Sequence, residues 1–189
     1  VHTTITAARA PSGRSFAAFH ALPGSLNQHE RQRWLDRLTW GQNDADQEEL
    51  ARLGIATWLT LQLNASPGAL SSAAQAQIDA MNISRTPIEV LAANMAARHR
   101  AAKALPTEDE RKAALKTWQQ DMRALQQEAA ARFVLRALYS PSQLREKMTW
   151  FWMNHFSVST RKADVRALVA DYEEHAIRPH ALGRFRDLL

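Results

Sequence analysis

The sequence contains no cysteine, and this absence removes several kinds of chemistry at once. Disulfide bonds, thiol catalysis and zinc or iron sites built on cysteine are all excluded. The absence fits the cytosol and equally an export route that does not use disulfides. Glycine and proline are scarce, with 6 and 7 residues among 189, which is too few for a loop-rich all-β chain. The composition therefore indicates a helical protein.

No stretch of the chain is apolar enough to cross a bilayer. The longest run without a charged residue, residues 54–78, is interrupted by Asn64, Pro67, Gly68 and several glutamines. The sequence also lacks the His-Glu-x-x-His zinc motif, the glycine-rich phosphate loop and the Gly-x-Ser-x-Gly nucleophile elbow. We therefore predict no membrane span, no metal and no cofactor, and the sequence leaves open whether the protein is an enzyme.

The net charge is +5 and the isoelectric point is near 10.1, so nucleic acid has to be considered as a partner. Acidic and basic residues are mixed along the chain and do not form a basic stripe. The tightest basic group, Arg98, His99, Arg100 and Lys103, falls on one predicted helical surface, where a solvated face is the simplest interpretation. We expect no nucleic acid partner.

The periodicity and the helix-start patterns predict an all-α fold. We expect an irregular multi-helix bundle of about seven or eight helices with an extended N-terminal arm. Residues 1–27 form the predicted arm, because they are rich in small residues and lack sustained periodicity. Residues 28–189 form a single helical domain. This domain is expected to be incomplete at its C-terminus, because the last residues continue a helical pattern without a stop signal.

Several helix boundaries can be predicted from single residues. Asn27 and Asp44 are expected to cap the first two helices, and Gly41 and Gly54 are expected to end them. In the stronger start patterns a serine or threonine cap accompanies a proline or an acidic residue. These patterns lie at residues 86–89, 106–110 and 140–143. In the first of them, Thr86 is the predicted cap.

The longest predicted helix runs from the pattern at residues 106–110 to about Tyr139. Its apolar positions alternate steps of three and four, as in the seam of an antiparallel or coiled-coil contact. These positions are Leu115, Trp118, Met122, Leu125 and Ala129. We expect the seam to pack within the chain, with an oligomer contact as the alternative.

The stretch at residues 144–156, LREKMTWFWMNHF, is apolar nearly all round in helical projection, which predicts a helix in the protein interior. On this basis Asn154 and His155 are buried or line a pocket, where polar groups need partners. A core hydrogen bond is the favoured interpretation of His155, ahead of metal binding or catalysis. Trp150 and Trp152 are expected in the core, although a carbohydrate platform would use the same residue type.

A second polar group lies in the C-terminal segment, where residues 163–178 are predicted as a helix that Pro179 bends. Asp171 and His175 are four residues apart, and so are Glu174 and Arg178, which is the spacing of pairs on one helical face. We name no catalytic residue. The candidate binding residues are Asn154, His155, Glu174, Arg178 and His180.

Three blocks of the sequence resemble one known family. They are LDRLTWG at residues 35–41 with the following Leu53-Gly54, the stretch 144–156, and YEEHAIRPHALGRFRDLL at residues 172–189. In order and spacing they resemble the bacterial family catalogued as Domain of Unknown Function 1800. The resemblance is good over about residues 30–63 and 140–189 and looser between them.

The resemblance implies a mainly helical protein without an established activity. It also implies export, to the periplasm or the medium, and a gene commonly found beside that of a sulfatase-like partner. Family members are usually longer, so a site completed by residues beyond 189 would be missing here. The family often has a histidine where this chain has Met153, which counts against a metal site of two neighbouring histidines.

Two functions from different classes follow from the sequence. The favoured one is a helical module of an exported protein that binds another protein or takes part in an assembly. The apolar seam and the lack of a catalytic motif support it. The alternative is a hydrolase-like, metal-assisted enzyme whose site uses His155 and His180 together with groups beyond residue 189.

Overall fold

The computed structural model describes residues 22–23, 25–65, 70–157 and 168–188, and all regular structure within these ranges is helical. The predicted all-α class is thereby confirmed. Most of the predicted arm and the start of the predicted helix at residues 163–178 lie outside the described residues. The division into an arm at 1–27 and a single domain at 28–189 stays a prediction.

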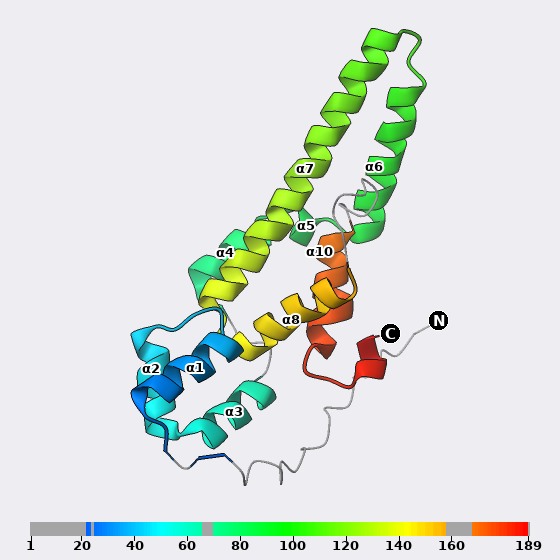
Figure 1. The fold of residues 1–189 in the computed structure, drawn as a ribbon. Coiled ribbons are helices and arrows are strands. Elements are labelled where there is room, and N and C mark those ends of the chain that lie inside the picture. Colours follow the sequence, from blue (N-terminus) through cyan, green and yellow to red (C-terminus); the bar gives the residue numbers. More distant parts are fainter. Residues whose placement is uncertain (1–21, 24, 66–69, 158–167, 189) are drawn as a thin grey trace, which may run out of the picture.

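The first three helices, α1 (Gln28–Leu38), α2 (Asp44–Leu53) and α3 (Ile55–Asn64), enclose one apolar core (Figure 1). Leu22 and Leu26, at the end of the predicted arm, pack against this core. Full burial of one large apolar side chain stabilises a fold by about 1.5–3 kcal/mol. The core residues are Leu35, Leu50, Ile55, Trp58 and Leu59.

Two of the predicted boundaries of these helices are confirmed. The Asn27 side chain accepts a hydrogen bond from the Glu30 amide at 3.0 Å, and the Glu30 carboxylate accepts one from the Asn27 amide at 2.8 Å. This reciprocal capping box starts α1. Gly54 ends α2 with a φ of 72°, a backbone conformation that favours glycine. The chain can therefore turn directly from α2 into α3.

The other two boundaries are wrong by one to three residues. α1 ends at Leu38 and not near Gly41, because Thr39 leaves the helix while its hydroxyl donates to a carbonyl of the last turn at 2.7 Å. The cap of α2 is Asn43 and not Asp44. Asn43 has the extended backbone of a cap, and its side chain accepts a hydrogen bond from the amide three residues on at 2.8 Å.

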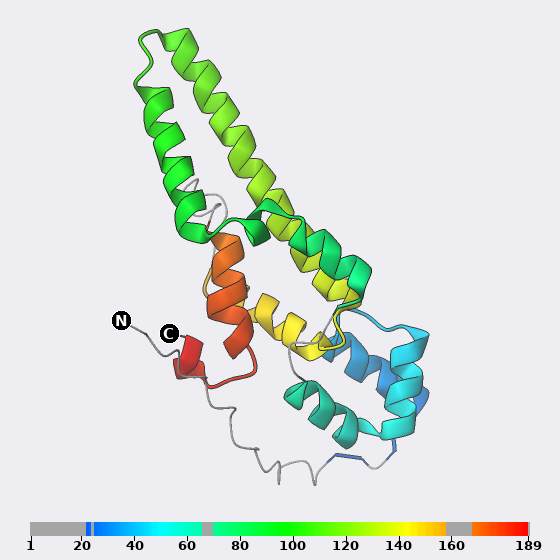
Figure 2. The ribbon, with the colours of Figure 1, turned by 180° about the vertical axis from the view of Figure 1, so that it is seen from behind.

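The middle of the chain forms α4 (Ser72–Asp79), α5 (Asn82–Arg85), α6 (Ile88–Lys103) and α7 (Glu108–Tyr139). α6 and the first half of α7 form a long antiparallel hairpin that projects from the rest of the molecule (Figure 1). α4 lies against the second half of α7, which is seen best from behind (Figure 2). The longest helix therefore contacts different partners along its length.

The predicted seam of α7 is an intramolecular contact. Leu91 of α6 packs against Trp118, Met122 and Leu125 in one buried cluster. The indole nitrogen of Trp118 also donates to the carbonyl of Met95 at 3.0 Å. The seam thus holds the two arms of the hairpin together, as expected from its alternating spacing.

The start of α6 differs from its prediction. Pro87 occupies the cap position, where Thr86 was expected, and the helix begins at Ile88. The Thr86 hydroxyl instead donates to the side chain of Asn82 in the short helix α5, at 2.8 Å. The preceding turn therefore takes the side chain that could otherwise have capped α6.

The start of α7 has the predicted capping box, and it supplies a first test of the fold. Thr107 Oγ1 accepts from the Glu110 amide at 3.3 Å, and the Glu110 carboxylate accepts from the Thr107 amide at 3.2 Å. We expect Thr107→Ala to lower the free energy of unfolding by about 1 kcal/mol, measured by urea denaturation. Thr117→Ala, at an exposed position inside α7, is the matched control and should not destabilise.

α8 (Gln143–His155) crosses the centre of the molecule between the first three helices and the C-terminal segment (Figure 1). Gln62 of α3 accepts from the Leu144 amide at 3.2 Å and donates to the carbonyl of Pro141 at 3.1 Å. Lys147 donates to the carbonyl of Thr39 at 2.9 Å. Polar contacts therefore join the start of α8 to both α3 and the end of α1.

The prediction that α8 is buried all round is wrong. Its buried side chains include Glu146 and Thr149, whereas Trp150 and Phe151 are 45% and 46% exposed. Asn154 is exposed, and so is His155. The physical reason is that the interior face of α8 carries a charged group with a buried partner, so several of its aromatic rings lie at the surface.

The C-terminal segment is more irregular than predicted. α10 (Val169–Asp171) continues without a break into a π-helix, η2 (Tyr172–Ile177). Two 3₁₀ turns follow, η3 (Arg178–His180) and η4 (Phe185–Leu188), and Pro179 lies in the first of them, where a bend was expected. The π-helix packs against α8, and α10 packs against α7.

Candidate functional site

A cluster of charged side chains is buried where α7, α8 and the C-terminal helices meet. α7 contributes two arginines four residues apart, so that both lie on one face of the helix. α8 contributes a glutamate, and η2 and η3 contribute the rest. All but one of these side chains are no more than 8% exposed, and Glu174 is half-buried. The cluster consists of Arg132, Arg136, Glu146, Glu173, Glu174 and Arg178.

The strongest pair of the cluster joins α8 to η3. Arg178 donates to Glu146 through two nitrogens, Nη2 to Oε1 at 2.5 Å and Nε to Oε2 at 3.1 Å. Burial alone would lower the pKa of Arg178, but the hydrogen bonds and charge of Glu146 outweigh it and raise that pKa. The guanidinium is therefore fixed in charge and in orientation.

Glu174 is bound mainly by two arginines of α7. Both of its carboxylate oxygens accept hydrogen bonds from Arg136, one of them at 2.9 Å from Nη2, and Arg132 lies within 3.9 Å. Burial raises the pKa of Glu174, but the hydrogen bonds and charge of Arg136 more than offset this, so the net effect is a lowered pKa. Glu174 is therefore a firmly ionised partner of the two arginines.

Glu173, its sequence neighbour, is in a different situation. It is 7% exposed and forms no hydrogen bond or ion pair with any residue that the structure describes. Burial raises the pKa of Glu173 to about 7, although the positive charges of Arg132 and Arg136 act in the opposite direction. A carboxyl group with this pKa is partly protonated at neutral pH, so it can accept or donate a proton there.

The Glu173 side chain lines a cavity of about 290 Å³ between α7, α8 and the α10–η2 segment. Phe133, Trp150 and Met153 give this cavity apolar walls, and Asn154 is one of its polar lining residues. The other lining residues are Gln126, Ala129, Ala130, Thr149 and Val169. One buried carboxyl group in a largely apolar hollow is the arrangement often found in binding sites.

The adjacent residues Glu173 and Glu174 both belong to the π-helix η2 but face different surroundings, as neighbouring residues of a helix do. Glu174 lies against α7 with Arg136, whereas Glu173 lines the cavity. π-helical turns are rare and occur frequently at functional sites, because they change which side chains share a face. Sequence periodicity does not reveal such a turn, and the α-helix predicted for this segment would give a different arrangement of faces.

The predicted site residues do not converge on one place. Glu174 and Arg178 belong to the cluster, and their predicted pairing exists only as a long contact of 4.0 Å. Asn154 lies at the cavity wall, where its amide nitrogen donates to the carbonyl of Trp150 at 2.7 Å. His180 lies in η3 and is half-buried. Only part of the expected site is therefore assembled.

His155 is the clearest correction. It is exposed and forms no core hydrogen bond with a described residue, so the predicted burial is wrong. Its ring stacks at 5.9 Å on Phe151 and lies at 6.5 Å from Phe185 of η4. These rings form a contiguous group at the surface, which we call the aromatic surface. It consists of Phe151, Trp152, His155, Phe156 and Phe185.

Other expectations about charged groups can also be compared with the structure. The predicted pair of Asp171 and His175 is confirmed, with 2.7 Å between the carboxylate and the imidazole.

Within the described residues, no group of three or more histidine and carboxylate side chains could hold a metal ion. No helix in the described parts of the chain is both long and apolar enough to span a membrane.

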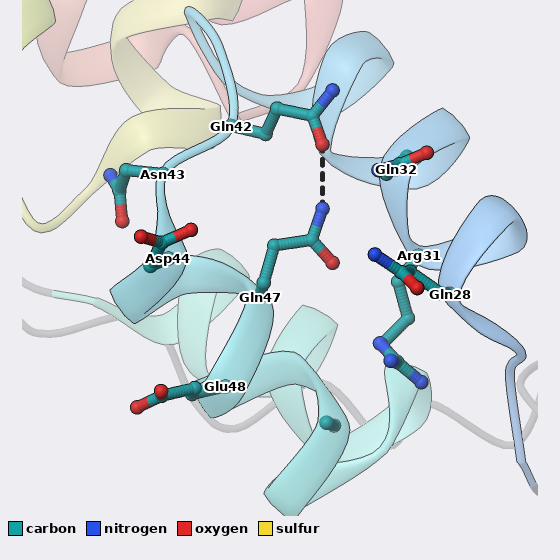
Figure 3. A pocket seen from close by; sticks show the side chains of 9 residues that line it. Gln28, Arg31, Gln32, Gln42, Asn43, Asp44, Gln47 and Glu48 are labelled. Atoms are coloured by element: carbon teal, nitrogen blue, oxygen red, sulfur yellow. Dashed lines mark hydrogen bonds between the residues drawn. The ribbon is translucent and has the colours of Figure 1, made fainter.

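A second concave region lies between α1 and α2, with a volume of about 470 Å³ (Figure 3). Amide side chains dominate its lining, and Gln47 donates to Gln42 across it at 2.6 Å. Arg31 donates to the carbonyl of Leu26 at 2.7 Å, and Asn43 caps α2. The polar groups of this region thus serve the local structure of the two helices.

The fold and this site define an all-helical protein with a buried arginine–glutamate cluster beside a small cavity. The chain belongs to the family described as "Protein of unknown function (DUF1800)", whose sequence model matches residues 33–189. The match covers the helices between the resembling blocks as well as the blocks themselves. Neither the curated proteins nor the solved structures contain a match to this chain.

Proposed function

We propose that the protein is an interaction module that binds another protein through the aromatic surface. The observation that carries this proposal is the exposure of connected rings, with Phe151 at 46% and Phe185 at 50%. Contiguous exposed apolar patches on soluble proteins commonly mark interaction sites. Aromatic residues are also the side chains most enriched at the centres of protein interfaces.

Charge around the aromatic surface indicates the chemistry of the partner. Arg184 and Arg186 flank Phe185 in the sequence, and both are exposed. Arg186 lies 3.6 Å from Asp187 at the surface, where such a pair contributes little. A complementary partner would present apolar side chains bordered by carboxylates. The sulfatase-like protein implied by the family resemblance is the partner to test first, and export to the periplasm or medium belongs to the same proposal.

The proposal predicts the effect of removing single rings. We expect Phe151→Ser and Phe185→Ser each to weaken binding of the sulfatase-like partner about 30-fold, since loss of an interface anchor costs about 2 kcal/mol. Leu61→Ser, at an equally exposed position of α3, is the matched control and should leave the affinity unchanged. Titration calorimetry measures the affinity, and circular dichroism checks the fold of each variant.

The outcomes of this experiment are distinguishable. Equal affinity of all three variants would contradict a role of the aromatic surface. Light scattering on the protein alone tests a second copy of the chain as the occupant. A dimer that both phenylalanine variants dissociate would replace the heterologous partner by self-association.

A hydrolase-like activity, the alternative from the sequence, has one observation in its favour. Glu173 has the pKa of about 7 that suits a general acid or base, and it lines a cavity. His155 and His180, the histidines expected in such a site, do not line this cavity. The interaction module is therefore the better-supported function.

A further inference from the structure

The carboxyl group of Glu173 lines a cavity and lacks a hydrogen-bond partner among the described residues. A carboxyl group that is more than nine-tenths buried normally has hydrogen-bond partners, because burial without them costs free energy. Glu173 has none among the described residues, and its side chain lines an open cavity. The arginines behind it are engaged elsewhere, Arg136 with Glu174 and Arg132 with the carbonyl of Ala170. A ligand could therefore supply the missing partners.

The charges around the cavity favour a neutral ligand. Three arginines and three glutamates lie together behind its wall, so their charges balance when every carboxyl group is ionised. A cationic ligand would gain no net attraction from this cluster, because the arginines next to Glu173 offset its charge, and an anionic ligand would meet the Glu173 carboxylate itself. The groups counted are Arg132, Arg136, Arg178, Glu146, Glu173 and Glu174.

The lining combines hydrogen-bonding groups with aromatic rings. The amide nitrogen of Asn154 donates to the carbonyl of Trp150, and its amide oxygen can accept a hydrogen bond from a ligand. The Trp150 ring is 45% exposed and is held edge-on by Trp40, with 5.4 Å between the ring centroids. Trp40 in turn contacts Phe133 at 5.2 Å. A supported, exposed indole therefore stands at the cavity beside two acceptor groups.

We propose that this cavity binds a saccharide unit, with Glu173 accepting hydrogen bonds from neighbouring hydroxyl groups and Trp150 packing against the apolar face of the sugar ring. A sugar ring carries hydroxyl donors at its edge and C–H groups on its faces, which matches this lining. The volume of about 290 Å³ suits a unit of about one or two rings. The proposal is independent of the aromatic surface.

The lining favours binding over hydrolysis of the saccharide. Most glycosidases use two carboxyl groups on opposite sides of the bond that they cleave. Among the described residues that line the cavity, Glu173 is the single carboxyl group. We therefore expect the saccharide to be bound and released without change.

The test uses the purified chain with glucose, cellotriose, maltotriose and triacetylchitotriose as probes, detected by saturation-transfer NMR and quantified by calorimetry. At least one probe should bind, and Glu173→Gln and Trp150→Ala should each weaken that binding about tenfold or more. Glu49→Gln makes the same change of charge at an exposed position of α2 and should leave binding unchanged.

Several results would overturn the proposal. One is the absence of binding by all four probes at millimolar concentration. Another is binding that neither Glu173→Gln nor Trp150→Ala alters. A third is tight binding of n-butylammonium that Glu173→Gln abolishes, since this would assign the cavity to organic cations. Thermal unfolding of each variant confirms that a lost signal does not come from a lost fold.

Discussion

Replacing Glu146 by alanine should lower the free energy of unfolding by about 3–5 kcal/mol, the largest loss that we expect from a single substitution in this protein. Glu146 is 3% exposed and Arg178 is 8% exposed, so the substitution leaves a buried guanidinium without its carboxylate. Water cannot reach the abandoned charge easily, and Glu174, 4.0 Å from Arg178, already serves Arg136. Urea denaturation monitored by circular dichroism measures the change.

An exposed ion pair provides the matched control for this experiment. Lys112 lies 3.6 Å from Glu108 near the start of α7, and both side chains are more than half exposed. Lys112→Ala should change stability by less than about 0.5 kcal/mol, because solvent screens such pairs. A loss from Glu146→Ala that is no larger than the loss from Lys112→Ala would contradict the buried pair.

Replacing Glu173 by glutamine should raise the free energy of unfolding at neutral pH, whereas Glu146→Ala lowers it. The ordinary pKa of this carboxyl group is 4.5, and burial raises it to about 7 in the folded protein. Below pH 4.5 both states are protonated, and Glu173 has no effect. Between pH 4.5 and about 7 the unfolded chain ionises first, so the folded state loses stability as the pH rises. Above about 7 the loss is complete.

The size of this effect follows from the two pKa values. One pKa unit corresponds to about 1.4 kcal/mol, so ionised Glu173 costs the folded protein about 3 kcal/mol at pH 8. Glutamine has the shape of the protonated side chain and does not ionise. The stability difference between Glu173→Gln and the unchanged protein should therefore be near zero at pH 4 and grow to about 3 kcal/mol at pH 8.

Denaturation curves at a series of pH values test this prediction. The lowered pKa of Glu174 gives the opposite dependence, with stability lost as the pH falls, but it is present in both proteins and cancels in the difference. A difference that stays constant from pH 4 to pH 8 would show that Glu173 is not desolvated as described. A stabilised Glu173→Gln protein would also exclude misfolding as the cause of lost saccharide binding.

Capping patterns and apolar periodicity predict the helices well, because each depends on residues that are close together in the sequence. The capping box of Asn27 and Glu30 joins residues three positions apart, and the seam through Trp118 follows from the helical repeat. The error at Asp44 arose because two neighbouring residues, Asn43 and Asp44, could both cap α2, and the backbone places Asn43 in the cap position. The error at Thr86 arose because its hydroxyl bonds to Asn82 of the preceding turn.

The charged cluster was only partly predictable, because its pairs join residues that are far apart in the sequence. Glu174 and Arg178 were identified, but the partners Arg136 and Glu146 lie 38 and 32 residues away. One local sign of the missing residues exists, a pair of arginines four apart within the apolar end of α7. Their spacing on one face could have marked a buried anion site, but the carboxylate that completes it has no signature in the sequence.

The exposure of His155 was also missed because a contact between residues distant in the sequence decides it. A helix with aromatic residues on all sides was expected to be buried, and the rule fails here because Glu146 and Thr149 occupy the inner face of α8. Amphipathic patterns describe how apolar a face is, and they do not show which face meets a buried arginine. The rings of Phe151 and its neighbours were left outside as a result.

The position of α8 has a mechanical consequence. The first turn of this helix is attached to α3 through Gln62 and to η3 through Glu146 and Arg178. The aromatic surface and the wall of the Glu173 cavity lie on the same helix. Both features therefore depend on the position of one helix. A rotation of α8 that opened the cavity would also tilt the aromatic rings, and a partner bound to those rings would restrict the movement of the cavity wall.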